Sequence, residues 1–437
     1  MNIILLSGGS GKRLWPLSND VRSKQFLKLF KNNDGNLESM VQRVYRQIKN
    51  IDSSINITIA TSNTQVSSIK NQLGDKVNIS VEPSRRDTFP AILLAVAYLH
   101  DVQKVDKDEA VIVCPVDQYV GEDYFYKVLD LYKIIENSSV NIALLGIKPD
   151  HPSDKYGYII PNDNQCKTSV KSFKEKPSID VAIEYIREGA LWNAGVFAFK
   201  ISYLLNKAKE ILGDCDYYGL LSQYNTLKKI SFDYEIVEKE NKILVLRYDG
   251  RWLDLGSWST LSSNMSERIM GDVVIGDGCD NVSVVNELDI PVLTMGIRNA
   301  VISTSPDGIL VSSLEQADRI KPYVENIHRV TMYADKSWGA FRVIDIENDS
   351  MTIKVTIQKG DRMNYHSHEH RDEVWVVTSG NGRTIVDGME QNIKKGDVIT
   401  MKAGCRHTVI ADTELKLIEV QLGKEISIND KRVYSIE

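Results

Sequence analysis

The fold class of this chain follows from one stretch near its start, Ile3-Ile4-Leu5-Leu6-Ser7-Gly8-Gly9-Ser10-Gly11-Lys12-Arg13-Leu14-Trp15-Pro16. Its first four residues form a short apolar run, which is typical of a strand buried on both faces. The glycine-rich turn that follows lets backbone N–H groups approach phosphate oxygens closely, and Lys12 and Arg13 add positive charge. The stretch therefore predicts a buried strand of an α/β protein that ends in an anion-binding loop.

Two common phosphate-binding loops do not fit this turn. A Walker A loop needs a glycine where Leu6 stands and a serine or threonine where Arg13 stands. A dinucleotide-binding loop needs a third glycine where Leu14 stands, which argues against a nicotinamide dehydrogenase. For the turn taken alone, an ordinary tight turn stays the alternative.

Short apolar runs and helical patterns alternate through the first two-thirds of the chain. We expect strands at residues 55–61, 110–115 and 141–147 and a helix over residues 37–48. This alternation predicts βαβ units and a mainly parallel, Rossmann-like sheet. Ligands of such sheets bind beyond the carboxyl ends of the strands, so loops 7–16 and 115–119 are candidate site segments.

The pattern changes near residue 269. Short β-type pieces broken by glycine, aspartate and asparagine predict a small β-rich middle segment, and residues 313–327 have a helical pattern. From residue 336 onward, alternating runs separated by glycine turns predict a closed all-β barrel. The expected domains are therefore residues 1–268, 269–330 and 331–437.

Composition excludes several classes of partner. The chain has 437 residues and a net charge of −6, which gives no electrostatic case for nucleic acid. It has no apolar run of the length that a membrane span needs, and we expect no signal peptide. Five scattered cysteines without a C-x-x-C pair suit free thiols in a reducing cytoplasm, where we place the protein.

Sequence blocks spread over roughly 260 residues carry a family resemblance. They are LLSGGSGKRLWPLS (5–18), KQFL (24–27), EPSRRDTFPAI (82–92), PVDQ (115–118), FKEKP (173–177), WNAGVF (192–197), SFDYE (231–235) and WLDLGSW (252–258). In this order they resemble the mannose-1-phosphate guanylyltransferases.

The resemblance implies transfer of GMP from GTP to mannose 1-phosphate, giving GDP-mannose and pyrophosphate for polysaccharide biosynthesis. The implied catalytic residues are Arg13, Lys24, Asp117 and Asp254, the two aspartates with Mg²⁺, a hard ion that prefers carboxylate and phosphate oxygens. The implied nucleotide-binding residues are Gly8, Gly9, Gly11, Lys12, Arg13, Glu82 and Arg85. The implied sugar-phosphate-binding residues are Glu175, Lys176, Asn193 and Asp233. A different nucleoside triphosphate and hexose 1-phosphate remain the alternative.

Four of the seven histidines fall within residues 364–407. His366 and His368 lie two apart, so in a strand they face the same side, and Glu373 and His407 complete three imidazoles and a carboxylate. The spacing of these residues and of the glycines around them fits the two cupin motifs. Such a set suits Zn²⁺ or another divalent transition metal, and spacing alone does not choose between them.

This C-terminal part resembles the isomerase domain of bifunctional guanylyltransferase and type II phosphomannose isomerase proteins, which implies interconversion of mannose 6-phosphate and fructose 6-phosphate. The supporting strings are HEHRDEVWVV (368–377) and IEVQLG (418–423). A non-catalytic metal-binding barrel, used for oligomerisation or sensing, remains the alternative. We expect a homo-oligomer, in the simplest case a dimer, with no nucleic acid or membrane partner.

Overall fold

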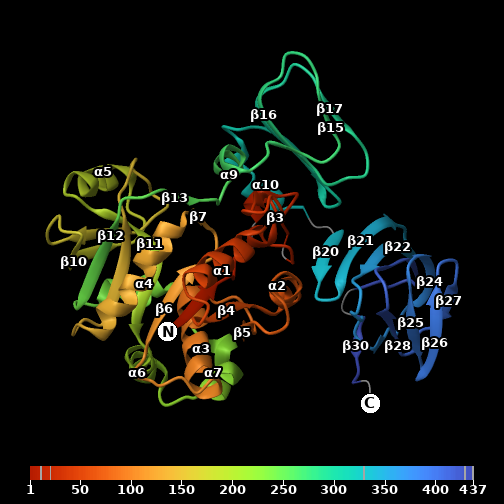
Figure 1. Ribbon diagram of the computed structural model, residues 1–437, viewed down its shortest axis with the longest axis horizontal. Helices are drawn as coiled ribbons and strands as arrows, with labels where there is room; N and C mark the ends of the chain where they lie inside the picture. Colours follow the sequence, from red (N-terminus) through yellow and green to blue (C-terminus); the bar gives the residue numbers. More distant parts are fainter. Residues whose placement is uncertain (10–11, 20, 328–329, 428–429, 436–437) are drawn as a thin grey trace. The chain divides into compact units, whose positions relative to one another are not determined.

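The computed structural model describes residues 1–9, 12–19, 21–327, 330–427 and 430–435. The chain clusters into two compact units, each described here by itself (Figure 1). The first unit comprises residues 1–10, 24–66 and 75–266, and the second comprises residues 11–23, 67–74 and 267–437. The three domains expected from the sequence stay a prediction.

A nine-stranded sheet forms the centre of the first unit (Figure 1). In spatial order its strands are β5 (Asn78–Glu82), β4 (Asn56–Ser62), β1 (Asn2–Leu6), β6 (Ala110–Pro115), β11 (Leu191–Lys200), β8 (Ile142–Ile147), β12 (Ile243–Tyr248), β10 (Lys167–Lys174) and β9 (Tyr158–Pro161). Two two-stranded sheets accompany it, β2 (Phe30–Lys31) with β3 (Leu37–Glu38) and β7 (Gln118–Val120) with β13 (Trp252–Asp254).

Half of this sheet has the expected parallel pairing. Strands β5, β4, β1 and β6 are parallel neighbours, and the register sets Leu6 beside both Ala60 and Pro115. Beyond β6 the sheet is mixed, because β11 is antiparallel to both β6 and β8. The prediction of a mainly parallel sheet therefore needs correction for this half. An apolar run predicts a buried strand but not the direction of its neighbour.

The helices of the first unit follow local sequence signals. They are α1 (Met40–Ile51), α3 (Thr88–Ala97), α4 (Glu122–Glu136), α5 (Ile179–Arg187), α6 (Ile201–Leu212), α7 (Tyr217–Gln223), α8 (Phe232–Glu235) and α9 (Trp258–Asn264), while α2 (Val66–Leu73) lies mostly in the second unit. The helix predicted over residues 37–48 starts later, because Ser39 and Gln42 form a capping box that fixes the start of α1. α3 is buried almost all round and lies in the main core.

The middle segment consists of short strands in a four-stranded and a two-stranded sheet, which agrees with the β-rich segment expected there. It contains β14 (Ile269–Met270), β15 (Val273–Ile275), β16 (Asp280–Asn286), β17 (Val292–Thr294), β18 (Arg298–Ser305) and β19 (Gly308–Ser313). The helix predicted over residues 313–327 is wrong in extent. Only a 3-10 turn, Ala317–Arg319, and α10 (Lys321–Val324) form, and Pro322, which has no N–H to donate, is confined to the first turn of α10.

The C-terminal part is the expected all-β barrel of two antiparallel sheets. One sheet has the order β20 (Tyr333–Lys336), β21 (Gly339–Ile346), β22 (Ser350–Ile357), β29 (Leu415–Leu422), β24 (Asp372–Ser379), β27 (Val398–Met401). The other has the order β26 (Met389–Lys394), β25 (Asn381–Val386), β28 (His407–Ala411), β23 (His366–Ser367), β30 (Arg432–Val433). Trp375 and a cluster of apolar side chains from both sheets fill the barrel core. Among the described residues, no helix is long and apolar enough to cross a bilayer.

Candidate functional site

The backbone of the loop after β1 is held in place by two glutamine side chains. Gln25 donates from Nε2 to the carbonyl of Ser7 at 3.0 Å, and Gln65 donates to the carbonyl of Gly9 at 3.1 Å. A Cβ added to Gly8 would lie 3.5 Å from Oε1 of Glu82, so the loop backbone passes close to this buried carboxyl. Gly11, a predicted phosphate-binding residue, lies outside the described residues.

Lys12 and Arg13 lie in a short 3-10 turn, Lys12–Leu14, that clusters with the second unit. Arg13 is exposed and Lys12 is partly buried. Both cationic side chains are therefore accessible to an anion in solution. Their role in binding the nucleotide stays a prediction.

Asp117 and Asp254 come together through the small sheet of β7 and β13. Asp117 directly precedes β7, and Asp254 at the end of β13 pairs with Gln118. The ammonium of Lys24 lies between them, with Nζ 2.8 Å from Oδ2 of Asp117 and 3.5 Å from Oδ1 of Asp254. Three residues from distant parts of the sequence therefore form one cluster beyond the carboxyl end of β6.

The charges in this cluster stabilise one another. Burial alone would lower the pKa of Lys24, but the carboxylates of Asp117 and Asp254 outweigh it and raise the pKa above its usual value. Burial alone would raise the pKa of Asp117, and the nearby Lys24 holds it below its usual value. Lys24 and Asp117 are therefore both charged at neutral pH.

The two carboxylates fit a hard divalent ion such as Mg²⁺. Their side chains are 37% and 34% exposed, so their oxygens can reach a ligand at the surface of the unit. A Cβ at Gly256 would lie 3.2 Å from both carboxylate oxygens of Asp254, and glycine leaves that side of the carboxylate open. Two carboxylates combined with substrate phosphate oxygens are a usual ligand set for Mg²⁺.

Glu82 lies beside the glycine loop at the end of β5. It is buried and accepts a hydrogen bond from the hydroxyl of Tyr224 at 3.0 Å. Burial raises the pKa of Glu82, while the Tyr224 hydrogen bond and the charge of Arg85 oppose the shift. Glu82 and Arg85, both predicted to bind nucleotide, therefore lie close enough to interact.

The four residues predicted to bind the sugar phosphate form a second cluster. Nζ of Lys176 lies 2.5 Å from Oε1 of Glu175, and Asn193 donates to Oδ1 of Asp233 at 2.7 Å. Burial and the neighbouring charge of Glu175 raise the pKa of Asp233 to about 7. The cluster offers acceptors for sugar hydroxyls and a cation for a phosphate, as the resemblance implies.

Replacing Asp233 by Asn is expected to change how stability depends on pH. The pKa of this carboxyl rises from 3.8 to about 7 on folding. The raised pKa stabilises the folded protein fully below about pH 4, and this contribution is lost as the pH rises through 7. The lost contribution is about 4 kcal/mol at most, from about 1.4 kcal/mol per pKa unit.

Thermal unfolding at pH 5 and pH 8 measures this effect. The Tm of Asp233→Asn minus that of wild type should be a few degrees larger at pH 8 than at pH 5. Asp180→Asn, at an exposed position in the first turn of α5, should keep the same Tm difference at both pH values. An equal Tm difference for Asp233→Asn at both pH values would contradict the assigned pKa.

Sequence reasoning missed Tyr156, which lies beside two tryptophans of the quoted sequence blocks. The ring of Tyr156 lies 4.8 Å from Trp192 and 5.4 Å from Trp252, measured between ring centroids. Burial and the charge of nearby Asp254 raise the pKa of Tyr156 to about 12, so its hydroxyl stays protonated and can donate. In the sequence, Tyr156 is marked only by the glycine that follows it. The structure explains that glycine, because a Cβ added to Gly157 would lie 2.5 Å from the carboxylate of Glu175.

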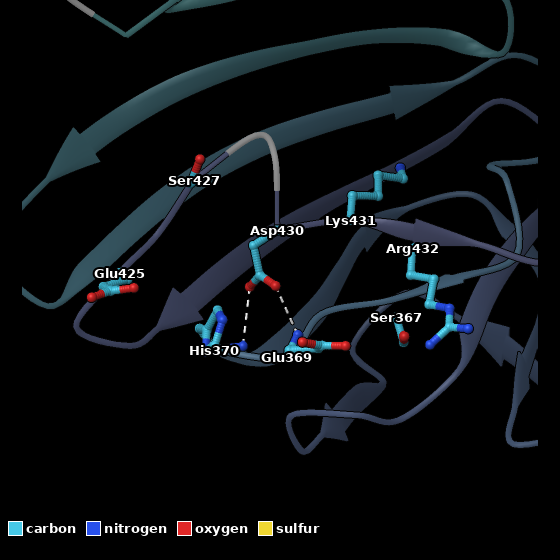
Figure 2. A pocket seen from close by; sticks show the side chains of 8 residues that line it. All are labelled: Ser367, Glu369, His370, Glu425, Ser427, Asp430, Lys431 and Arg432. Atoms are coloured by element: carbon cyan, nitrogen blue, oxygen red, sulfur yellow. Dashed lines mark hydrogen bonds between the residues drawn. The ribbon is translucent and has the colours of Figure 1, made fainter.

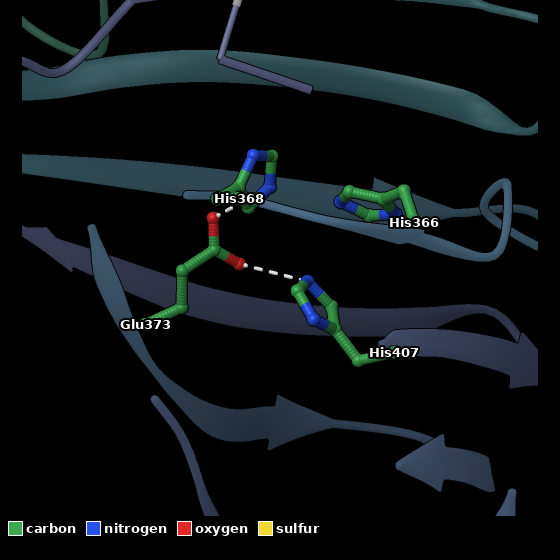
Figure 3. A group of neighbouring side chains, drawn as sticks. All are labelled: His366, His368, Glu373 and His407. Atoms are coloured by element: carbon green, nitrogen blue, oxygen red, sulfur yellow. Dashed lines mark ion pairs between the residues drawn. The ribbon is translucent and has the colours of Figure 1, made fainter. Parts of the chain in front are cut away.

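The predicted histidine cluster is assembled inside the barrel (Figure 3). Its four members are buried, and one ligand atom from each lies within 4.8 Å of the others: His366, His368, Glu373 and His407. β23 and β28 are neighbours, and their register pairs His366 with His407. Glu373 comes from β24 in the other sheet.

Backbone carbonyls orient the three imidazoles through their Nδ1 atoms. Nδ1 of His366 donates to the carbonyl of Asn364 at 2.6 Å, and Nδ1 of His407 donates to that of Cys405 at 3.0 Å. Nδ1 of His368 donates to the carbonyl of Asp430. A carbonyl can only accept, so each Nε2 keeps a lone pair, and that of His368 accepts from Nη2 of Arg371 at 3.0 Å.

Two of these buried atoms have no hydrogen-bond partner among the described residues. They are Oε2 of Glu373 and Nε2 of His407, 3.2 Å apart. Burial is costly for such atoms, and a divalent ion would satisfy both. The donor set of three imidazoles and one carboxylate therefore fits a transition metal.

A pocket adjoins this cluster where β23 meets the C-terminal segment (Figure 2). The carboxylate of Asp430 accepts hydrogen bonds from the backbone N–H groups of Glu369 at 2.8 Å and His370 at 3.1 Å. The described residues that line the pocket are Ser367, Glu369, His370, Glu425, Ser427, Asp430, Lys431 and Arg432. Since Ser367 separates His366 from His368, this mixed-charge pocket lies next to the strand that carries His366.

Comparison with known protein families settles which family the first two-thirds of the chain represent. Residues 2–268 match the family model described as "Nucleotidyl transferase". The chain belongs to the nucleotidyl transferase family. The match covers the glycine loop, the cluster of Lys24, Asp117 and Asp254, and the four residues predicted to bind the sugar phosphate.

The barrel of this nucleotidyl transferase matches a second family model. Residues 324–434 match "Mannose-6-phosphate isomerase C-terminal", and all four members of the histidine cluster lie within the match. The cupin-like C-terminal domain predicted from the sequence is thereby confirmed, and the chain carries both an enzyme domain of the transferase type and an isomerase-type domain.

Two individual relatives match the chain over nearly its full length, and a solved structure matches about three quarters of it. A putative mannose-1-phosphate guanylyltransferase of Vibrio cholerae is 28% identical, covering 98% of each chain. A mannose-1-phosphate guanylyltransferase of Escherichia coli K12 is 27% identical, covering 98% of this nucleotidyl transferase and 96% of the relative. A crystal structure from Thermus thermophilus, described as a mannose-1-phosphate geranyltransferase, has a TM-score of 0.60 and 26% identity, covering 74% of this chain and 98% of that one.

Proposed function

We propose that this protein transfers GMP from GTP to mannose 1-phosphate, producing GDP-mannose and pyrophosphate. The observation that carries the proposal is the cluster of Lys24, Asp117 and Asp254 beyond the end of β6. Relatives that match the chain over nearly its full length carry the name of this activity, which supports the choice of substrates.

The residues of the first unit and the glycine loop divide the reaction between them. An oxygen of the sugar phosphate attacks the α-phosphorus of GTP, and the bond to the β-phosphate breaks as pyrophosphate leaves. Amides of the glycine loop and Arg13 would hold the triphosphate, and Lys24 would balance charge at the α-phosphate. Asp117 and Asp254 would hold Mg²⁺, which supplies positive charge to the phosphates.

The second cluster would hold the acceptor. Glu175 and Asp233 offer oxygens to sugar hydroxyls, while Lys176 faces the phosphate, so both reactants are aligned without covalent chemistry by the protein. Asn193 keeps Asp233 in place and is itself fixed, because its Oδ1 accepts from the N–H of Gly195 at 3.0 Å.

A second activity is supported by the buried histidine cluster. We propose that the barrel interconverts mannose 6-phosphate and fructose 6-phosphate, with His366, His368, Glu373 and His407 holding Zn²⁺ or a similar ion. The bound metal would polarise the substrate oxygens beside the carbons between which a proton moves. A metal-binding barrel without catalysis is the competing hypothesis.

Pyrophosphate release tests the substrate assignment directly. Four nucleoside triphosphates are each combined with mannose 1-phosphate, glucose 1-phosphate and galactose 1-phosphate in the presence of Mg²⁺. We expect GTP with mannose 1-phosphate to give a kcat/KM at least about tenfold above any other pair. A higher kcat/KM for another pair would reassign the substrates while keeping the reaction type.

A further inference from the structure

The segment that links the glycine loop to Lys24 is held at three points by later parts of the second unit. The carbonyl of Pro16 accepts from the hydroxyl of Ser305 at 2.7 Å. Asn19 donates from Nδ2 to Oδ2 of Asp307 at 2.8 Å. The third point is Arg22, two residues before Lys24, and it carries the strongest interaction of the three.

Arg22 is clamped by groups from two different parts of the second unit. Its Nη1 and Nη2 donate to the two carboxylate oxygens of Glu287 at 2.7 and 2.9 Å, which is a bidentate pair. Its Nε lies 3.9 Å from Oδ2 of Asp335, and its guanidinium stacks over the ring of Tyr333 at 5.0 Å. Glu287 follows β16 of the middle segment, whereas Tyr333 and Asp335 belong to β20 of the barrel.

The charged side chains of this clamp are largely buried. The side chain of Arg22 is 12% exposed and that of Glu287 is 28% exposed. Burial alone would lower the pKa of Arg22, but Glu287 and Asp335 outweigh it and raise the pKa above its usual value. Removing one partner of such a pair leaves the other charge partly buried and uncompensated, so the segment would be driven to rearrange.

The clamp is connected to Lys24 by a very short piece of chain. Two residues of backbone span at most about 7 Å. The intervening Ser23 is fully buried, so this piece has little freedom to absorb a displacement. A shift of Arg22 is therefore passed on to Lys24.

We propose that Arg22 is a positioning residue for nucleotidyl transfer: Glu287 and Asp335 fix it, and it fixes Lys24 between Asp117 and Asp254. The inference rests on the proposed transferase function. It gives the middle segment and the first barrel strand a role in the transferase reaction, because their carboxylates hold the chain that carries Lys24. A displacement of about 1 Å at a charge-balancing group is enough to slow such a reaction strongly.

The test combines two measurements on the full chain, of which one needs no substrate. Arg22→Met removes the clamp, Glu287→Gln weakens it without changing shape, and Arg22→Lys keeps the charge without the bidentate geometry. Arg46→Met is the matched control, since Arg46 makes the same kind of bidentate pair with Glu38, at 3.0 and 2.8 Å. The first measurement is acylation of Lys24 by an amine reagent, followed by mass spectrometry; the second is kcat and KM for GTP.

For Arg22→Met we expect Lys24 acylation to rise at least threefold and kcat to fall at least tenfold. Glu287→Gln should also raise Lys24 acylation and lower kcat, each by a smaller factor. The Lys24 acylation and kcat of Arg22→Lys should lie between those of Arg22→Met and wild type. Arg46→Met should leave both within twofold of wild type.

Unchanged Lys24 acylation in both Arg22→Met and Glu287→Gln would overturn the proposal, whatever happens to the melting temperature. If Arg22→Met fails to fold, the isosteric Glu287→Gln decides by the same two measurements. If the wild type itself transfers no nucleotide, the proposed function fails, and the acylation pattern still decides whether Arg22 positions Lys24.

Discussion

Replacing Asp117 or Asp254 by Asn should lower kcat for pyrophosphate release by a factor of about 10² to 10³, the usual loss when one charge-stabilising group is removed from such a site. Each substitution keeps the size of the side chain and removes one of the two charges that surround Lys24. Both side chains are about one-third exposed, so the fold should survive. Initial-rate kinetics at saturating substrates, with a Mg²⁺ titration for each variant, measure the effect.

The double variant separates a joint role from two independent ones. If the carboxylates act on one ion and one ammonium, Asp117→Asn with Asp254→Asn should be little slower than the worse single variant. Asp130→Asn is the control, because Asp130 also pairs with a lysine, Lys133 at 2.9 Å, on the exposed face of α4. A single variant that keeps more than half of kcat with an unchanged Mg²⁺ requirement would remove that carboxylate from the site.

The sequence predicted the positions of the strands better than it predicted which strands pair and in which direction. The run at residues 110–115 coincides with β6, and the runs at 55–61 and 141–147 match β4 and β8 to within a residue or two. Burial on both faces makes such strands continuously apolar, which is why they are visible. The same property hides direction, and the antiparallel placement of β11 between β6 and β8 depends on contacts far apart in the chain.

The candidate sites show the same division between local and distant information. The histidine cluster could be predicted because His366 and His368 lie only two residues apart, at and just after β23, and their spacing is local. The meeting of Asp117 with Asp254 depends on pairing between two three-residue strands, β7 and β13, which carry no periodic signal. The clamp on Arg22 is hidden for the same reason, since Glu287 lies 265 residues further along the chain.

Replacing His407 by Ala should release the barrel metal and abolish isomerisation of mannose 6-phosphate. His407 offers one of four buried ligand atoms, and its partner Glu373 would be left with a buried, uncompensated carboxylate oxygen. Losing a ligand from such a set should weaken metal affinity by at least about 10²-fold, since changes to groups that merely orient ligands already cost about 10- to 100-fold. Metal content of the purified full-length protein, measured by mass spectrometry, gives the result without an activity assay.

A matched histidine and the second activity make this prediction decisive. His370 is exposed and lies in the pocket beside the cluster, so His370→Ala should keep the metal. Transferase kcat/KM should stay within twofold in both variants, because the transferase residues lie in another part of the chain. Metal retained in His407→Ala would contradict the ligand set. Metal lost from His407→Ala, in a protein whose wild type binds metal yet never isomerises mannose 6-phosphate, would instead favour a barrel that binds metal without catalysis.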